Sequence, residues 1–346
     1  MNMNILQPTT ATILGTYKCT AACEDCCFES NPYITKRISL EKILEFIDDA
    51  IQLKSIELIV FSGGECFLLG QDLIEAISYA HKAGLRTRCV SNGYWAENKQ
   101  IGYKRLNELK QAGLNELNIS TGDFHQKWIP EQAVINATLL SFELNLDAIC
   151  IMVETQKERK VTATNLLDKL KTNRNFNSES KKFKIIESPW MPMHQDRTIQ
   201  QQSNLFANSD NIHTKTGCDS ILQTIVLTPD SKLGLCCGLS REKIPELNQF
   251  WQKGSLEEQL DSAGKNFLNI WIFVEGPEKI LAWAAKKEPK IDWQNKYAHR
   301  CHACLSIFND PLVQQTIQKY YHERITPILW RYSLMKQKHN LLYEYI

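Results

Sequence analysis

Short apolar runs alternate with longer amphipathic segments along the first half of the chain. The amphipathic segments carry apolar residues three and four positions apart, as in the series Leu40, Ile43 and Leu44, which is typical of a helix with one buried face. The apolar runs have the length and composition of buried strands. They cover residues 12–17, 56–61, 85–90, 115–120, 146–153 and 183–187.

Residues that favour helix ends mark the bounds of several helical segments. Ser39 is suited to the N-cap of the first helix, and Gly84 to the position just after the second. A helix over 99–112 is closed by Gly113, and Pro130 opens the next one. These signals agree with the hydrophobic pattern on where the helices begin and end.

Strands joined by helical segments of about 10–15 residues predict βαβ units and a parallel sheet. A helix over about 162–171 and the strand at 183–187 complete six such units. Because a closed barrel of this type needs eight units, we expect an α/β fold with a partial (β/α)6 TIM-type barrel. Its functional residues should lie in the loops at the carboxyl ends of the strands.

The alternation of predicted strands and helices ends after Pro189. Residues 221–227 and 232–236 flank the turn Thr-Pro-Asp-Ser and predict a hairpin. Helical segments follow, and a long apolar-striped helix is expected from about residue 311 to the end. We therefore predict a barrel core over 1–200, a small α+β extension over 201–310 and a C-terminal helix over 311–346.

Composition places the chain among globular proteins. Of its 346 residues, 43% are apolar and 23% charged, and 40 basic against 39 acidic residues give a net charge of +1. Such a balance offers no electrostatic case for binding nucleic acid or an anionic membrane. The first 14 residues lack a signal-peptide pattern, and no apolar run reaches 18 residues. We expect a cytoplasmic protein.

Cysteine is the unusual feature of the composition, with twelve residues. That number is too small for a disulfide scaffold, and in a reducing compartment clustered cysteines usually serve metal or redox chemistry. Three of them, Cys19, Cys23 and Cys26, follow the first predicted strand with the spacing C-x3-C-x2-C. Three thiolates at this spacing can hold one face of an iron–sulfur cubane and leave the fourth iron free for a small ligand.

At these residues the chain resembles the radical S-adenosylmethionine (radical SAM) superfamily, and the order of elements over residues 12–190 is similar as well. The resemblance implies a 4Fe-4S cluster on Cys19, Cys23 and Cys26 whose open iron chelates S-adenosyl-L-methionine (SAM). Reductive cleavage of SAM then gives methionine and a 5′-deoxyadenosyl radical. Asp25 stands where the family usually has an aromatic residue, and Cys27 directly after Cys26 leaves open a ligand shifted by one position.

The resemblance also implies residues that hold the cofactor. Gly63, Gly64 and Glu65 follow the second strand and resemble the family's Gly-Gly-Glu motif, which binds the methionine ammonium. Glycines there let backbone approach a ligand closely. Three further positions at the ends of the third and fourth strands resemble polar contacts to the cofactor, with Ser120 at the ribose-contacting position. They are Ser91, Asn92 and Ser120.

Other polar residues near the strand ends are weaker candidates. Asp123 and His125 either face the substrate or belong to an ordinary loop, as an Asx turn and a solvated histidine. Glu154 follows the fifth strand. Trp190, His194 and Arg197 either line a pocket or form part of an interdomain linker.

A second set of cysteines lies in the last third of the chain. Cys218, Cys236, Cys301 and Cys304 supply enough thiolates for a second 4Fe-4S cluster or a tetrahedral zinc site. The segment 228–237 resembles the auxiliary-cluster region of radical SAM enzymes with SPASM or shortened twitch extensions, although Ser231 replaces a glycine. Cys237 stays open as an alternative to Cys236. The other cysteines, Cys66, Cys89 and Cys150, fit small apolar positions.

These resemblances imply an enzyme that abstracts hydrogen from a substrate, with peptide maturation as the favoured class. The auxiliary cluster would exchange an electron with the substrate radical, and an external donor such as flavodoxin or ferredoxin would reduce the first cluster. Radical chemistry on a small molecule with the same scaffold is the alternative. A non-catalytic zinc-binding α/β protein is the second alternative.

Overall fold

We describe the chain from a computed structural model at residues 8–191, 200–237, 244 and 247–343. The described strands form one sheet in the order β6-β5-β4-β3-β2-β1-β7-β8-β9. Strands β1 to β6 pair in parallel, β7 is parallel to β1, and the pairs β7–β8 and β8–β9 are antiparallel. Their bounds are β1 Thr10–Leu14, β2 Leu58–Ser62, β3 Arg86–Ser91, β4 Glu116–Gly122, β5 Ala148–Thr155, β6 Phe183–Pro189, β7 Thr224–Leu227, β8 Lys232–Gly234 and β9 Asn248–Phe250.

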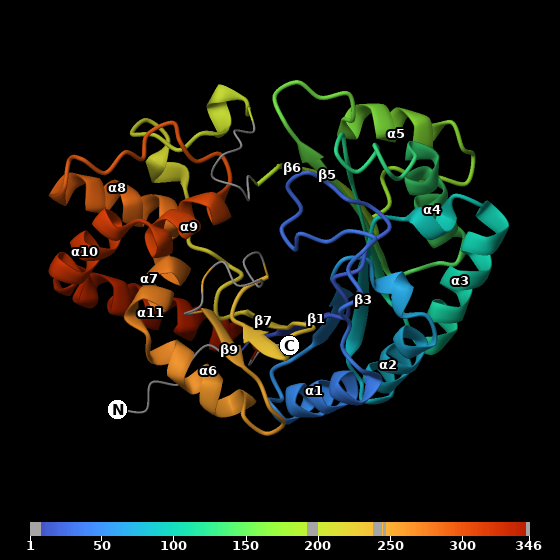
Figure 1. Ribbon diagram of the computed structural model, residues 1–346, viewed down its shortest axis with the longest axis horizontal. Helices are drawn as coiled ribbons and strands as arrows, with labels where there is room; N and C mark the ends of the chain where they lie inside the picture. Colours follow the sequence, from blue (N-terminus) through green and yellow to red (C-terminus); the bar gives the residue numbers. More distant parts are fainter. Residues whose placement is uncertain (1–7, 192–199, 238–243, 245–246, 344–346) are drawn as a thin grey trace.

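Five helices cover the outer side of the curved sheet from β1 to β6 (Figure 1). They are α1 Leu40–Gln52, α2 Gln71–Lys82, α3 Lys99–Ala112, α4 Glu131–Glu143 and α5 Ala163–Lys171. The sheet does not close on itself, because β6 and β9 stand at its two ends. The predicted α/β class and partial barrel are therefore confirmed.

The helix ends follow the capping residues of the sequence. The Ser39 hydroxyl accepts a hydrogen bond from the Lys42 amide at 3.3 Å, which satisfies one free donor of α1. Gly113 closes α3 in the left-handed conformation with φ 113°. Pro130 is the N-cap of α4 and lies just outside the first turn. Apolar faces such as Phe46 and Ile47 of α1 are fully buried.

The hairpin after Pro189 continues the barrel sheet instead of forming a sheet of its own. Strand β7 pairs in parallel with β1, with Thr10 opposite Thr224 and Ile13 opposite Leu227. This pairing satisfies the backbone hydrogen-bonding groups along the second edge of β1. Residues 11–14 of β1 are buried on both faces. The sheet therefore crosses the first of the predicted domain boundaries, and the division into three parts stays a prediction.

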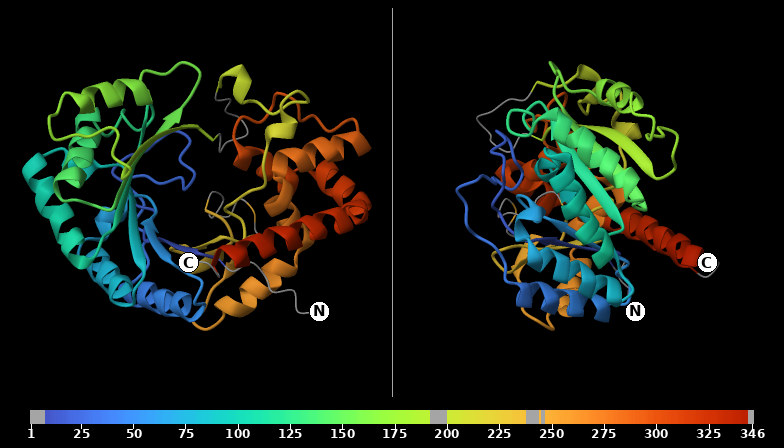
Figure 2. Two further views of the ribbon diagram at one scale, coloured as in Figure 1. Left: turned by 180° about the vertical axis from the view of Figure 1, so that it is seen from behind. Right: turned by 90° about the vertical axis from the view of Figure 1, so that its right-hand side faces the viewer.

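The remaining helices gather beyond β7 and β9, on the other side from α1 to α5 (Figure 1; Figure 2). The single long helix expected after residue 311 is wrong, because the chain breaks at Tyr321 into α10 and α11. The two halves pack on different neighbours, α10 against α8 and α9, and α11 against α7. The bounds are α6 Leu256–Lys265, α7 Phe267–Glu275, α8 Pro277–Lys287, α9 Arg300–Asn309, α10 Pro311–Tyr320 and α11 His322–Tyr343.

None of the helices in the described part of the chain has both the length and the apolar character needed to cross a bilayer.

Candidate active site

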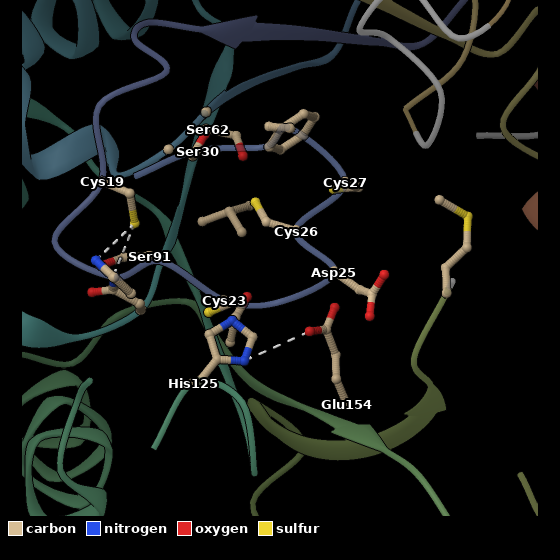
Figure 3. Close-up of a pocket in the computed structure, with 18 of the residues that line it drawn as sticks. Cys19, Cys23, Asp25, Cys26, Cys27, Ser30, Ser62, Ser91, His125 and Glu154 are labelled. Atoms are coloured by element: carbon tan, nitrogen blue, oxygen red, sulfur yellow. Dashed lines mark hydrogen bonds and ion pairs between the residues drawn. The ribbon is translucent and has the colours of Figure 1, made fainter. Parts of the chain in front are cut away.

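A cavity opens at the carboxyl ends of the parallel strands, where the sequence placed the functional loops. Its empty volume is about 760 Å³. The loop after β1, the ends of β2 to β5 and the segment after β6 all contribute to its wall (Figure 3). The predicted residues that line it are Cys19, Cys23, Cys26, Gly63, Gly64, Ser91, Asn92, Ser120 and His125, with Glu154 and Trp190 from the weaker candidates.

The loop after β1, residues 15–37, brings the three cysteines of the motif to this cavity. Its two arms are tied together by the hydrogen bond from the Cys19 amide to the Asn31 carbonyl, at 3.1 Å. Burial raises the pKa of the Cys19 thiol to about 12 and raises the pKa of Cys23 and Cys26 as well. Thiols in this setting become thiolates when a cationic iron centre compensates for their burial. The donor set therefore fits an iron–sulfur cluster.

Gly63 and Gly64 pack their backbone against the same loop. The Gly64 amide donates to the Thr16 carbonyl at 2.7 Å, and the Glu65 amide donates to the Lys18 carbonyl at 3.0 Å. A Cβ atom at Gly64 would overlap the Lys18 carbonyl group, so no other residue fits without moving the loop. The two glycines thus line the cavity and hold the cysteine loop in place.

Glu65 is placed differently from what the resemblance implied. Its side chain is 1% exposed and does not line the cavity. One carboxylate oxygen accepts from the Phe67 amide at 3.0 Å, and the other accepts from the Ser91 hydroxyl at 3.1 Å and the Asn92 amide at 2.9 Å. Burial raises the pKa of this carboxyl to about 7. The carboxylate therefore organises the strand ends beneath the cavity.

The polar residues that end β3 divide their contacts between this carboxylate and the cysteine loop. Ser91 also accepts hydrogen bonds from the Gly93 amide and the Trp95 indole. The Asn92 side-chain amide donates to the Cys19 sulfur at 3.5 Å and to the Thr20 hydroxyl at 3.0 Å. Asn92 is thus joined directly to a predicted cluster ligand.

The structure separates the two weak catalytic candidates. Both carboxylate oxygens of Asp123 accept hydrogen bonds from backbone amides, and Asp123 does not line the cavity. The donors belong to Lys160 and Val161, so Asp123 fixes the loop before α5. These donors lie 37 and 38 residues along the chain, so the contact is not the Asx turn considered from the sequence.

His125 does line the cavity, beside Glu154 (Figure 3). Its Nδ1 lies 3.6 Å from a Glu154 carboxylate oxygen, and no hydrogen bond to Nδ1 occurs within the described residues. Burial lowers the pKa of His125 to about 4 and raises that of Glu154 to about 8. Both groups are then neutral at pH 7, so their contact is not an ion pair.

Several lining residues were not singled out from the sequence. Asp25, which was noted only because it replaces an aromatic residue, points toward Glu154 across the cavity (Figure 3). Its carbonyl accepts from the Trp190 indole at 3.2 Å. No local pattern marks the others as pocket residues; they include Ser30, Ser62 and Met191. His194 and Arg197 lie outside the described residues.

The second set of cysteines is also brought together, from three distant segments. Burial raises the pKa of Cys301 and Cys304 well above the usual range, and the nearby thiols of Cys218 and Cys236 raise the pKa of both further. Cys236 is 8% exposed, whereas the Cys237 sulfur accepts a hydrogen bond from the Ser220 hydroxyl at 3.0 Å. Cys237 also raises the pKa of Cys301, and more than Cys218 does, so the choice between Cys236 and Cys237 stays open.

The two cysteine sets approach each other at Cys27. This residue lines the cavity, and its pKa is raised by burial first and then by Cys26, Glu154, Cys301 and Cys237. Across the described part of the chain, no group of three or more His, Cys, Asp or Glu side chains is arranged to hold a single metal ion. A cubane has several irons, so its thiolates stand further apart than the ligands of one ion.

Comparisons with known proteins agree with this geometry. The Radical SAM superfamily pattern matches residues 13–167, which include the cysteine motif and strands β2 to β5. The "Putative peptide biosynthesis protein YydG" of Bacillus subtilis (strain 168) is 24% identical over 320 residues, which cover 88% of this chain and 95% of that protein.

Among the solved structures that resemble this chain, one with a TM-score above 0.5 shows the same fold. Native anSMEcpe with bound AdoMet and Cp18Cys peptide has a TM-score of 0.52 and 12% sequence identity, over 95% of this chain and 99% of that one. Streptococcus suis SuiB bound to S-adenosylmethionine has a TM-score of 0.43 and 12% identity, over 77% of this chain and 68% of that one. With the cysteine motif at the mouth of a partial barrel and a matching sequence pattern, the chain is a radical SAM superfamily enzyme.

Proposed function

We propose that this enzyme abstracts a hydrogen atom from a peptide by means of a 5′-deoxyadenosyl radical. The observation that carries the proposal is that Cys19, Cys23 and Cys26 line one cavity together with the Gly63–Gly64 backbone at the ends of parallel strands. Three thiolates would hold a 4Fe-4S cluster, and the glycine backbone and Ser120 would bind SAM beside it.

The chain's own residues position the reacting groups and limit access of water. When bound and reduced, the cluster supplies one electron that splits the SAM sulfonium into methionine and the 5′-deoxyadenosyl radical. A one-electron donor such as flavodoxin or ferredoxin provides that electron. Trp190 and Met191 cover one side of the cavity and are 5% and 8% exposed, so they keep that wall dry.

A peptide is the substrate class that the comparisons favour. YydG carries the name of a peptide biosynthesis protein, and its match spans nearly all of both chains. The anSMEcpe structure, which shares the fold, contains a bound peptide. No Lys or Arg side chain lines the described part of the cavity, whereas the carboxyl groups of Asp25 and Glu154 do. Because the pKa of Glu154 is raised to about 8, this wall offers no counter-charge to an anionic group and favours a neutral part of the peptide.

The second cysteine set would hold an auxiliary 4Fe-4S cluster on Cys218, Cys236, Cys301 and Cys304. Its predicted role is to accept one electron from the substrate radical. In total the substrate would lose a hydrogen atom to the deoxyadenosyl radical, an electron to this cluster and a proton to solvent. Cys27 lines the cavity and its pKa is raised by thiols of both sets, so a substrate beside Cys27 would be close to both.

Cysteine variants test both clusters. Anaerobic reconstitution should load about eight irons per chain, as two cubanes require. With dithionite and SAM the enzyme should form 5′-deoxyadenosine, and Cys23→Ala should abolish this product. Cys301→Ala or Cys304→Ala should preserve SAM cleavage but block the net change in mass of a peptide encoded beside the gene. Cys150→Ala, outside both sets, is the matched control.

Three outcomes would count against the proposal. Stoichiometric zinc without iron would support the zinc-binding alternative. Loss of SAM cleavage in the Cys301 and Cys304 variants, with retention in Cys23→Ala, would reverse the two assignments. A small molecule that changes mass where peptides do not would leave the radical chemistry and remove the peptide.

A further inference from the structure

We infer that Asn92 tunes the reduction potential of the N-terminal cluster through a hydrogen bond to the sulfur of Cys19. This inference rests on the proposed cluster at Cys19, Cys23 and Cys26. It assigns Asn92 a positioning and electronic role toward a cluster ligand, in place of the contact with SAM that the family resemblance implied.

The geometry places the amide nitrogen, and not the oxygen, against the sulfur. The Asn92 Oδ1 accepts a hydrogen bond from the Tyr94 amide at 3.0 Å, and a backbone N–H can only donate. The side-chain nitrogen must therefore face the other way, toward Cys19 at 3.5 Å and Thr20 at 3.0 Å. Its two hydrogens match these two acceptors.

The backbone holds Asn92 in this orientation. Its own amide donates to the buried Glu65 carboxylate at 2.9 Å, and the residue is only 6% exposed. Glu65 also fixes the preceding residue through the Ser91 hydroxyl. The Glu65 carboxylate holds the Asn92 backbone, and the backbone holds the side chain. A substitution of the Asn92 side chain therefore removes the contact with the Cys19 sulfur but keeps the hydrogen bond between Glu65 and the Asn92 backbone.

A donor at a cluster thiolate changes the energy of the two oxidation states unequally. The reduced cluster carries one more negative charge, so an N–H group pointing at its sulfur stabilises the reduced state more. Cys19 also accepts from the Ala21 amide at 3.4 Å, which any side-chain variant keeps. Loss of the Asn92 donor should therefore lower the reduction potential only in part and leave the cluster bound.

Two substitutions and one control test this role in the reconstituted full-length enzyme. Asn92→Leu removes the donor at similar size, and Asn92→Asp removes it and adds a negative charge. Thr20→Val removes the other acceptor of the same amide and leaves the contact with sulfur. The readout is the electron paramagnetic resonance signal that changes when SAM is added, titrated against solution potential.

At the wild-type midpoint we expect the ratio of reduced to oxidised cluster to fall roughly three- to tenfold in Asn92→Leu and further in Asn92→Asp. Thr20→Val should titrate like the wild type. Unchanged titration of an iron-replete Asn92→Leu enzyme would overturn the inference. Absence of any SAM-responsive signal in the wild type would instead refute the proposed function.

A measurement on the wild type covers the case in which the variants do not load iron. Selective labelling of asparagine side chains with nitrogen-15 should give a hyperfine coupling to the reduced cluster in pulsed resonance experiments. A labelled enzyme with a normal cluster signal and no such coupling would contradict the hydrogen bond directly.

Discussion

Glu65 shows how a residue in a recognisable motif can act through its neighbours. The motif predicted a negative charge at the cofactor, but the carboxylate lies beneath the cavity and accepts three hydrogen bonds of 2.9–3.1 Å. Every one of these partners is a donor, so a carboxylate or carboxyl oxygen fits and an amide nitrogen does not. Its burial is nearly complete and raises its pKa from 4.5 to about 7.

The raised pKa of Glu65 predicts a loss of stability with rising pH. A carboxyl whose pKa is higher in the folded state binds its proton more tightly there, so its contribution is full below pH 4.5 and is lost as pH rises to about 7. A pKa shift of this size changes the free energy of unfolding by roughly 3 kcal/mol. Urea unfolding of the iron-free protein should show a steeper decline between pH 5 and 7.5 for the wild type than for Glu65→Gln. Equal slopes would contradict the buried titration.

The loop of residues 15–37 owes its position to close backbone contact with the end of β2. Gly63 has φ 124°, in the region that favours glycine, and Gly64 lies against the Lys18 carbonyl group. Two short hydrogen bonds from residues 64 and 65 fix this approach. The glycines therefore hold the cysteine loop in position, in addition to any contact with a cofactor.

Gly64→Ala should displace this loop. Its Cβ would overlap backbone, which cannot move aside as a flexible side chain can, so we expect a loss of roughly 2–3 kcal/mol in unfolding free energy. Iron content after reconstitution should fall from about eight to about four per chain as the N-terminal cluster fails to form. Gly84→Ala is the control, because it has a positive φ but open space around it. Equal iron content in the two variants would disprove the account.

One continuous sheet leads into segments of both cysteine sets, whereas Cys301 and Cys304 lie in helix α9. Strand β1 carries the N-terminal motif on its following loop and pairs with both β2 and β7. The hairpin of β7 and β8 leads into Cys236, so the same sheet positions a predicted ligand of the second cluster. The loop after β1 lies between the two groups of helices in Figure 2.

A chain ending at residue 215 should therefore not fold properly. It would lose β7 and expose a second edge of β1, a strand buried over residues 11–14. We expect aggregation or a reduced content of secondary structure, measured by size-exclusion chromatography and circular dichroism. A monodisperse fragment with the barrel's full secondary structure would show that the core is an independent domain.

Local signals in the sequence were enough to predict the barrel strands, the capped helices and the cysteine motif, because each depends on residues close together in the chain. Cys19, Cys23 and Cys26 from the cysteine motif line one cavity with Gly63 and Ser120, which the family resemblance indicated. The direction of a buried side chain is a different matter. Glu65 and Asp123 both satisfy backbone donors, and nothing in their neighbours along the chain reveals this.

Contacts across long sequence separations came from the folded molecule alone. Packing and the need to satisfy buried polar groups decide which distant segments meet. Examples are the pairing of β7 with β1 and the hydrogen bond from Asn92 to Cys19. The break between α10 and α11 at Tyr321 likewise follows from their different packing partners. Periodicity and spacing report which face of an element is buried, but not what it is buried against. The motifs therefore identified the chemistry, and the packing of distant segments determined which side chains meet it.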